Sequence, residues 1–152
     1  MSAKNMEQDV SWFKSLLYAS DEECLFDTDE LVSMALTYPP ILVACADGIM
    51  DNEERVVLAT MARALGESDG DELTEELKYL ERYASFVKLA TINDADKSRL
   101  LELLGAYCSK DPEVSTLILN SIYNIAEASN GISSEEQNVI DEIKLKLNIA
   151  IN

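Results

Sequence analysis

The sequence predicts an all-α fold of seven or eight helices, and two observations support this. No stretch alternates between β-branched or aromatic residues and polar ones, which is the pattern of a half-buried strand. Apolar residues instead recur at spacings of three and four, and only 5 glycines and 3 prolines interrupt the 152-residue chain. Each helix has recognisable start or stop signals.

Two helical segments are expected in the first third of the chain. The first covers about residues 10–19 and leads into an acidic connection. Asp27 or Asp29 caps the second, because a carboxylate beside a helix start accepts hydrogen bonds from N–H groups that have no partner in the helix. The Tyr-Pro-Pro sequence at residues 38–40 must kink or break this helix before it resumes over residues 41–46, since proline has no amide hydrogen.

Two more helices are expected in the middle of the chain. One opens at Asp51 and ends at Gly66, a favourable C-terminal stop. The next follows the polar turn at residues 67–76 and continues to about Ala90. We expect its buried face to consist of apolar residues at spacings of three and four. These residues are Leu73, Leu77, Leu80, Ala84 and Val87.

Three helices complete the chain. Asp94 or Asn93 caps a leucine-rich helix that extends to Cys108, and a capping aspartate followed by proline opens the next at residues 111–112. The last begins at Ser133 and ends near residue 148. We expect two helix–loop–helix units joined by a helical hairpin.

Composition favours a compact soluble protein and argues against an enzyme. At 152 residues and 47% hydrophobic, the chain can close one core without help from a cofactor. It contains neither an apolar run long enough to span a membrane nor a secretory signal, so we expect a cytoplasmic protein. The absence of histidine removes the commonest general base and most transition-metal ligand sets. The 3 cysteines form no CxxC pair and are expected to be reduced.

The net charge of -17 is unevenly distributed. Residues 21–76 contain sixteen acidic residues against two arginines, whereas the rest of the chain contains thirteen acidic and ten basic residues. A negative field of this kind repels phosphate backbones and anionic lipids, so we expect neither nucleic acid nor a membrane as partner. Cations and basic protein surfaces are the remaining candidates, and a well-solvated acidic face is the alternative.

One acidic motif occurs twice, 82 residues apart. The first copy is Ala-Cys-Ala-Asp-Gly-Ile-Met-Asp-Asn-Glu-Glu at residues 44–54, and the second is Ala-Glu-Ala-Ser-Asn-Gly-Ile-Ser-Ser-Glu-Glu at residues 126–136. The same offset pairs identical residues outside the motif, among them Val57 with Val139 and Leu65 with Leu147. We interpret this as an internal duplication, with copies at about residues 29–66 and 111–148.

Both copies place a glutamate at a helix start. Asp51 with Glu54, and Ser133 with Glu136, have the capping-box spacing, in which each side chain accepts a hydrogen bond from the other residue's backbone N–H. At about 100° per residue, Glu54 and Glu136 also lie over the apolar stripes of their helices and should face inward. A carboxylate in that position is costly unless it is hydrogen-bonded or binds a cation.

The first copy would suit a divalent cation. Asp47 lies on the turn seven residues before Glu54, and all-oxygen sites favour calcium, magnesium or manganese over zinc or copper. The segment from Asp47 to Glu54 also matches the second half of an EF-hand loop. The first half does not match, because Val43 and Cys45 would stand at the two leading ligand positions.

The pattern Ala46-Asp47-Gly48-x-Met50-x-x-x-Glu54, at the end of an apolar helix and repeated downstream, resembles the TerB-like family associated with bacterial tellurite resistance. The resemblance covers roughly residues 25–150, preceded by a helix and acidic connection at residues 1–24. It implies a duplicated all-helical domain, an acidic metal site, and a role in stress or metalloid response or beside chaperone-like partners.

Carried over from that family, the acidic residues of the metal site fall on Asp47, Glu54 and Glu136. The second copy departs from the family pattern, since Ser129 and Asn130 replace the aspartate and the glycine. It is therefore the weaker candidate for a metal site.

Three functions are compatible with these features. The first is a non-enzymatic TerB-like protein whose acidic first half binds a cation or docks a basic partner. The second is an interaction module in which the motif only caps helices; Trp12 and Phe13 either form its exposed patch or pack on the core. An enzyme with a carboxylate-bridged metal centre ranks last, because such centres normally use a Glu-x-x-His pair. Self-association is left open.

Overall fold

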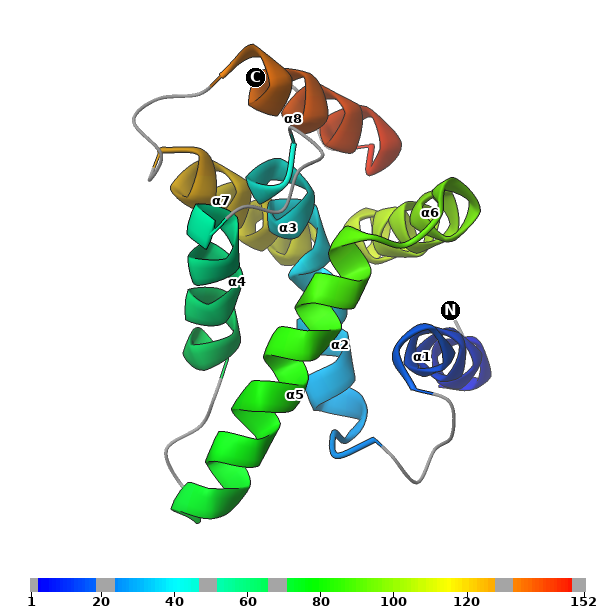
Figure 1. Ribbon diagram of the computed structural model, residues 1–152. Coiled ribbons are helices and arrows are strands. Elements are labelled where there is room, and N and C mark those ends of the chain that lie inside the picture. The colour runs from blue at the N-terminus through cyan, green and yellow to red at the C-terminus, as the bar shows by residue number, and fades with distance from the viewer. Residues whose placement is uncertain (1–2, 19–23, 47–51, 66–70, 128–132, 149–152) are drawn as a thin grey trace.

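The computed structural model describes residues 3–18, 24–46, 52–65, 71–127 and 133–148, and these residues form helices and their connections without any strand (Figure 1). The all-α prediction is confirmed. This part of the chain contains eight helices, or seven if α2 and α3, which only Thr37 separates, are counted as one. The helices are α1 (Ala3–Leu17), α2 (Thr28–Leu36), α3 (Tyr38–Ala44), α4 (Asn52–Ala64), α5 (Glu72–Ala90), α6 (Asp94–Lys110), α7 (Pro112–Glu127) and α8 (Ser134–Lys146). None of these helices combines the length and the apolar character needed to cross a membrane.

The start of α2 is fixed by a complete capping box. Asp27 Oδ1 accepts a hydrogen bond from the backbone N–H of Glu30 at 2.8 Å, and Glu30 Oε1 accepts one from the N–H of Asp27 at 3.2 Å. Asp27 rather than Asp29 is therefore the cap. The expected break falls at Thr37, so the two prolines lie in the first turn of α3, where an amide hydrogen is not required.

Helix α3 lies at the centre of the molecule. It packs against α2, α4, α5, α7 and α8 (Figure 1), and five of its 7 residues are buried. The hydrophobic core around it includes Tyr38 of α3, Phe86 of α5 and Leu104 of α6. Phe13 and Leu17 belong to the same core, so the N-terminal helix α1 is an integral part of it.

Helices α5 and α6 do not form the expected hairpin. α5 packs against α4, α3 and α1, whereas α6 packs against α7, α8 and α2 (Figure 1). The close approach of α6 to the end of α8 depends on Gly105. A Cβ atom added there would lie 3.2 Å from the backbone oxygen of Lys146, which is tighter than an ordinary contact.

The second helices of the two predicted copies agree in their bounds and burial. Under the 82-residue offset, α4 and α8 begin and end at equivalent positions. Leu58 and Ile140 are equivalent and fully buried, and Glu54 and Glu136 are equivalent and half-buried. The first helices differ, because α7 is continuous where α2 and α3 are separated. The common origin of the copies stays a prediction.

Candidate functional site

Glu136 acts as a helix-capping residue. Its backbone N–H donates to Ser133 Oγ at 3.1 Å, and its Oε1 accepts a hydrogen bond from the N–H of Ser133 at 3.0 Å. These two bonds complete a capping box at the start of α8. Because the carboxylate is hydrogen-bonded, its half-buried position above Ile140 needs no further explanation.

Glu54 occupies the equivalent place in the first turn of α4 and is half-buried. The other two residues predicted for this motif, Asp47 as ligand and Asp51 as cap, lie outside the described residues. Among the residues that the structure describes, no three acidic or cysteine side chains are grouped so that they could hold a metal ion. Of the three side chains predicted to act in the first copy, Asp47, Asp51 and Glu54, the described residues therefore include only Glu54.

A polar cavity of about 310 Å³ opens between the start of α2, the end of α4 and the first half of α5. No sequence motif pointed to it, because its residues come from segments far apart in the chain. It is lined by four carboxylates and two cationic side chains together with Ser33, Met34 and Leu65. The charged residues are Asp27, Asp29, Glu30, Glu75, Lys78 and Arg82.

Both cations in the cavity are engaged with groups of the protein. Lys78 Nζ donates to the two carboxylate oxygens of Glu30 at 3.0 and 3.3 Å and so links α5 to α2. Arg82 is only 4% exposed; its Nε donates to the carbonyl oxygen of Ala62 at 2.8 Å, and its guanidinium lies 3.9 Å from Glu75. The remaining charge of the cavity is negative, which favours cations or basic side chains as ligands.

Four of the five residues on the face of α5 that was expected to be buried are exposed, whereas the fifth, Val87, is partly buried against the core. Leu73, Leu77 and Leu80 are 68%, 51% and 52% exposed, and Ala84 continues the same line on the surface. We refer to these four residues as the leucine stripe. The side chains that enter the core lie on the other side of the helix: Arg82, Ser85, Phe86 and Leu89. The prediction for α5 was therefore wrong about which face is buried.

Helix α5 has two apolar faces, and periodicity alone does not show which of them is buried. Phe86 and Leu89 have the same helical spacing as two members of the leucine stripe, but the stripe is longer and dominates the pattern. Arg82, on the same side as Phe86, made that side look polar. Its burial depends on the carbonyl group of Ala62, which no local pattern in α5 reveals.

Trp12 and Phe13 do not form an exposed aromatic patch. Phe13 is 2% exposed and belongs to the core, and Trp12 is partly buried. The guanidinium of Arg99 lies 4.3 Å from the centre of the Trp12 ring and covers it from the side of α6. The alternative that these aromatics pack on the core is confirmed.

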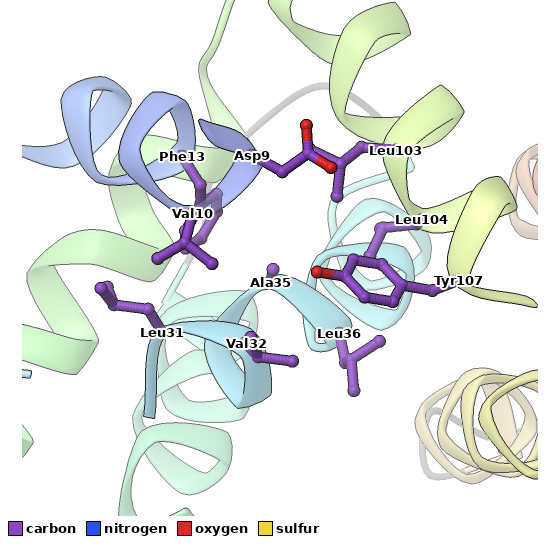
Figure 2. Close-up of a pocket in the computed structure, with 10 residues that line it drawn as sticks. All are labelled: Asp9, Val10, Phe13, Leu31, Val32, Ala35, Leu36, Leu103, Leu104 and Tyr107. Atoms are coloured by element: carbon purple, nitrogen blue, oxygen red, sulfur yellow. The ribbon is translucent and has the colours of Figure 1, made fainter. Parts of the chain in front are cut away.

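A second hollow, between α1, α2 and α6, is apolar and small. Figure 2 shows the side chains of Val10, Leu31, Leu104 and Tyr107 around it. Its volume of about 10 Å³ is no more than a single water molecule requires. Burial, with a smaller contribution from Asp9, raises the pKa of Tyr107. The hollow is a small packing gap where α1, α2 and α6 meet.

Comparison with known proteins identifies no relative. No family model matches the chain, and no curated protein or solved structure matches it either. The acidic cavity and the leucine stripe are therefore the basis on which a function is proposed.

Proposed function

We propose that this protein is a non-enzymatic interaction module whose acidic face docks a basic partner protein. The acidic face is the end of the molecule at which α2 and α5 begin, seen at the bottom of Figure 1. It consists of exposed and half-exposed carboxylates that line the polar cavity or lie at the start of α5. They are Asp27, Asp29, Glu30, Asp71, Glu72 and Glu75.

The observation that carries this proposal is the charge inside the cavity. Lys78 is already paired with Glu30, and Arg82 is already hydrogen-bonded to Ala62 and close to Glu75. A lysine or arginine side chain from a partner can reach Asp29 at the rim without displacing either cation. Electrostatic attraction of this kind accelerates encounter and selects partners of opposite charge.

Calorimetric titration with a lysine homopolymer of about 20 residues tests the proposal, because charge-driven binding should weaken steeply between about 0.05 and 0.5 M salt. The double variant Asp29→Asn/Glu72→Gln should bind at least about threefold more weakly than the wild type at low salt. The control Glu102→Gln/Glu113→Gln removes the same charge from exposed sites on α6 and α7 and should bind like the wild type. If the two variants lost affinity for the homopolymer equally, or if the wild type did not bind it at low salt, the acidic face would be rejected as the docking surface.

The resemblance to the TerB-like family supports a second proposal, in which Asp47 and Glu54 bind a divalent cation in a stress or metalloid response. The half-buried place of Glu54, in the first turn after the segment that contains Asp47, favours this site. Calcium, magnesium and manganese are titrated calorimetrically into the wild type and Asp47→Asn. Heat from the wild type alone is expected; no heat, or equal heat from both proteins, rejects the cation site.

A further inference from the structure

We infer that the leucine stripe of α5 is the surface on which an amphipathic helix of the basic partner docks. This inference rests on the proposed function and adds to it the form in which the partner binds. It starts from an apolar face that the fold leaves outside. Leu73, Leu77 and Leu80 each expose more than half of their surface, although other leucines of the chain, such as Leu89 and Leu104, are fully buried.

The stripe has the geometry of a helix-packing seam. Its members follow one another at intervals of four, three and four residues, which are the intervals of alternating seam positions in a coiled coil. From Leu73 to Ala84 the stripe extends about 16 Å along the helix axis, enough to contact roughly three turns of a partner helix. A helix laid along α5 could bury all four side chains at once.

The rest of α5 holds the stripe rigidly in place. Phe86 and Leu89 anchor the helix in the core, and Arg82 ties it to α4 from the side opposite the leucines. Lys78 ties the same helix to α2. A partner would therefore meet a preformed surface, and binding would not incur the entropy cost of ordering α5.

The charges beside the stripe favour a basic partner. Both cations in this half of α5, Lys78 and Arg82, are turned into the cavity and away from the leucines. The charged residues that flank Leu77 and Leu80 are Glu76 and Glu81. Glu76 is 3.0 Å from Arg63 of α4, whose guanidinium also lies 3.6 Å from the centre of the Tyr79 ring. Both side chains of the ion pair are more than half exposed, and such a surface pair is weak. Lysine or arginine beside the apolar residues of the partner helix would complement this border.

The same charges disfavour a second copy of this chain as the occupant. An antiparallel pair of α5 helices centred on the stripe would bring the two Glu81 side chains to the same side of the seam, about 7.5 Å apart along the axis. A parallel pair would bring Glu76 of one copy beside Glu81 of the other. Like charges at these flanking positions destabilise helix pairs.

The test uses two synthetic helical peptides of about 18 residues, both with leucine at the seam positions; one has lysine and the other glutamate at the flanking positions. Binding of each labelled peptide to the full-length protein is measured by fluorescence anisotropy. The variant Leu77→Gln/Leu80→Gln removes the middle of the stripe. The control Leu117→Gln/Leu145→Gln changes two leucines on α7 and α8 that are 54% and 74% exposed. Thermal unfolding by circular dichroism establishes that both variants are folded.

The lysine peptide should bind the wild type and the control alike, and binding to Leu77→Gln/Leu80→Gln should be at least about tenfold weaker. The glutamate peptide should bind much more weakly than the lysine peptide. Equal binding of the lysine peptide to all three proteins would show that the leucine stripe is not the docking surface, but the proposed role of the acidic face would remain. If the lysine peptide bound none of the three proteins, the result would count against both the stripe and the acidic face. A wild-type dimer in sedimentation that becomes monomeric in Leu77→Gln/Leu80→Gln would assign the stripe to a second copy and overturn the inference.

Discussion

Arg82 joins α5 to α4 by donating a hydrogen bond from its Nε to the carbonyl oxygen of Ala62, 2.8 Å away. Ala62 belongs to the last turn of α4, where carbonyl groups lack a partner inside the helix. A cation also interacts favourably with the negative end of the helix dipole. This contact satisfies the buried guanidinium, so that a charged residue of α5 lies inside while the leucine stripe of the same helix lies outside.

Replacement of Arg82 by methionine should destabilise the protein by about 2 kcal/mol, because a charge-assisted hydrogen bond is lost and the carbonyl group of Ala62 loses its partner. Urea unfolding followed by the fluorescence of the single tryptophan measures the effect. Arg63→Met is the control, since Arg63 pairs with Glu76 on the surface and its loss should matter much less. Equal stability of Arg82→Met and the wild type would show that the contact with Ala62 is not needed.

The variant Ser133→Ala removes the N-terminal cap of α8 and should lower the free energy of unfolding by about 1 kcal/mol. The reason is that the N–H of Glu136 loses the hydroxyl that accepts its hydrogen bond. The matched control is Ser134→Ala in the first position of the helix, where alanine is a better helix former and stability should be unchanged or slightly higher. Chemical denaturation compares the two. The loss in Ser133→Ala should be the same with and without calcium; a loss seen only with the cation would contradict a purely capping role.

A larger residue at Gly105 should push α6 away from the end of α8. Gly105→Val should lower the free energy of unfolding by more than about 1 kcal/mol, because its branched side chain would meet the backbone of Lys146 and Leu147. Valine is a better helix former than glycine, so propensity alone would not cause this loss. Ala95→Val, at an exposed site of α6, shows the effect of a valine that meets no neighbouring backbone. Thermal unfolding measures both. Similar small decreases in stability in the two variants would mean that α6 can move away from the end of α8 at little cost.

Stability should fall as the pH rises from about 10 to 12, because burial raises the pKa of Tyr18 to about 12 against an ordinary value of 10.0. The unfolded chain ionises this tyrosine first, so the stabilisation is complete below pH 10 and is lost through pH 12. Burial raises the pKa of Tyr38 as well and acts in the same direction. Urea unfolding of the wild type and Tyr18→Phe across this range should give a shallower decline for the variant. Identical slopes would contradict the prediction.

The three thiols should react at different rates. Burial raises the pKa of the Cys108 thiol, partly offset by its hydrogen bond with Ser115, whereas Cys24 and Cys45 are only partly buried. An aromatic disulfide reagent should therefore modify the native protein in two faster phases and one slow phase. Cys108→Ala should lose the slow phase alone. Three indistinguishable rates would show that Cys108 is as accessible as the others.

The starts of α2, α6 and α8 could be predicted from sequence because they depend on neighbouring residues. The starts of α1 and α5 were not predicted correctly, since α1 begins at Ala3 rather than near residue 10 and α5 at Glu72, inside the expected polar turn. Asp27, Asn93 and Ser133 cap their helices through side chains that reach only three residues ahead. The break before α3 follows from the covalent structure of proline. The capping role of Glu136 was predictable for the same reason.

The orientation of α5 and the acidic cavity could not be predicted from sequence. The buried side of α5 is selected by contacts with α4 and α3, and its decisive hydrogen bond joins residues that are 20 positions apart. The cavity combines residues 27–34 with residues 65–82, and its chemistry exists only once α2 and α5 lie together. Sequence spacing describes one helix at a time and contains neither relationship.

The position of α3 ties the two predicted copies into one cooperative unit. This short helix belongs to the first copy, yet it packs against both helices of the second as well as α4 and α5. Seven residues are too few to stay helical in water without such neighbours. Neither half of the chain can therefore open or be excised while the other keeps its shape, and the molecule should unfold in a single step.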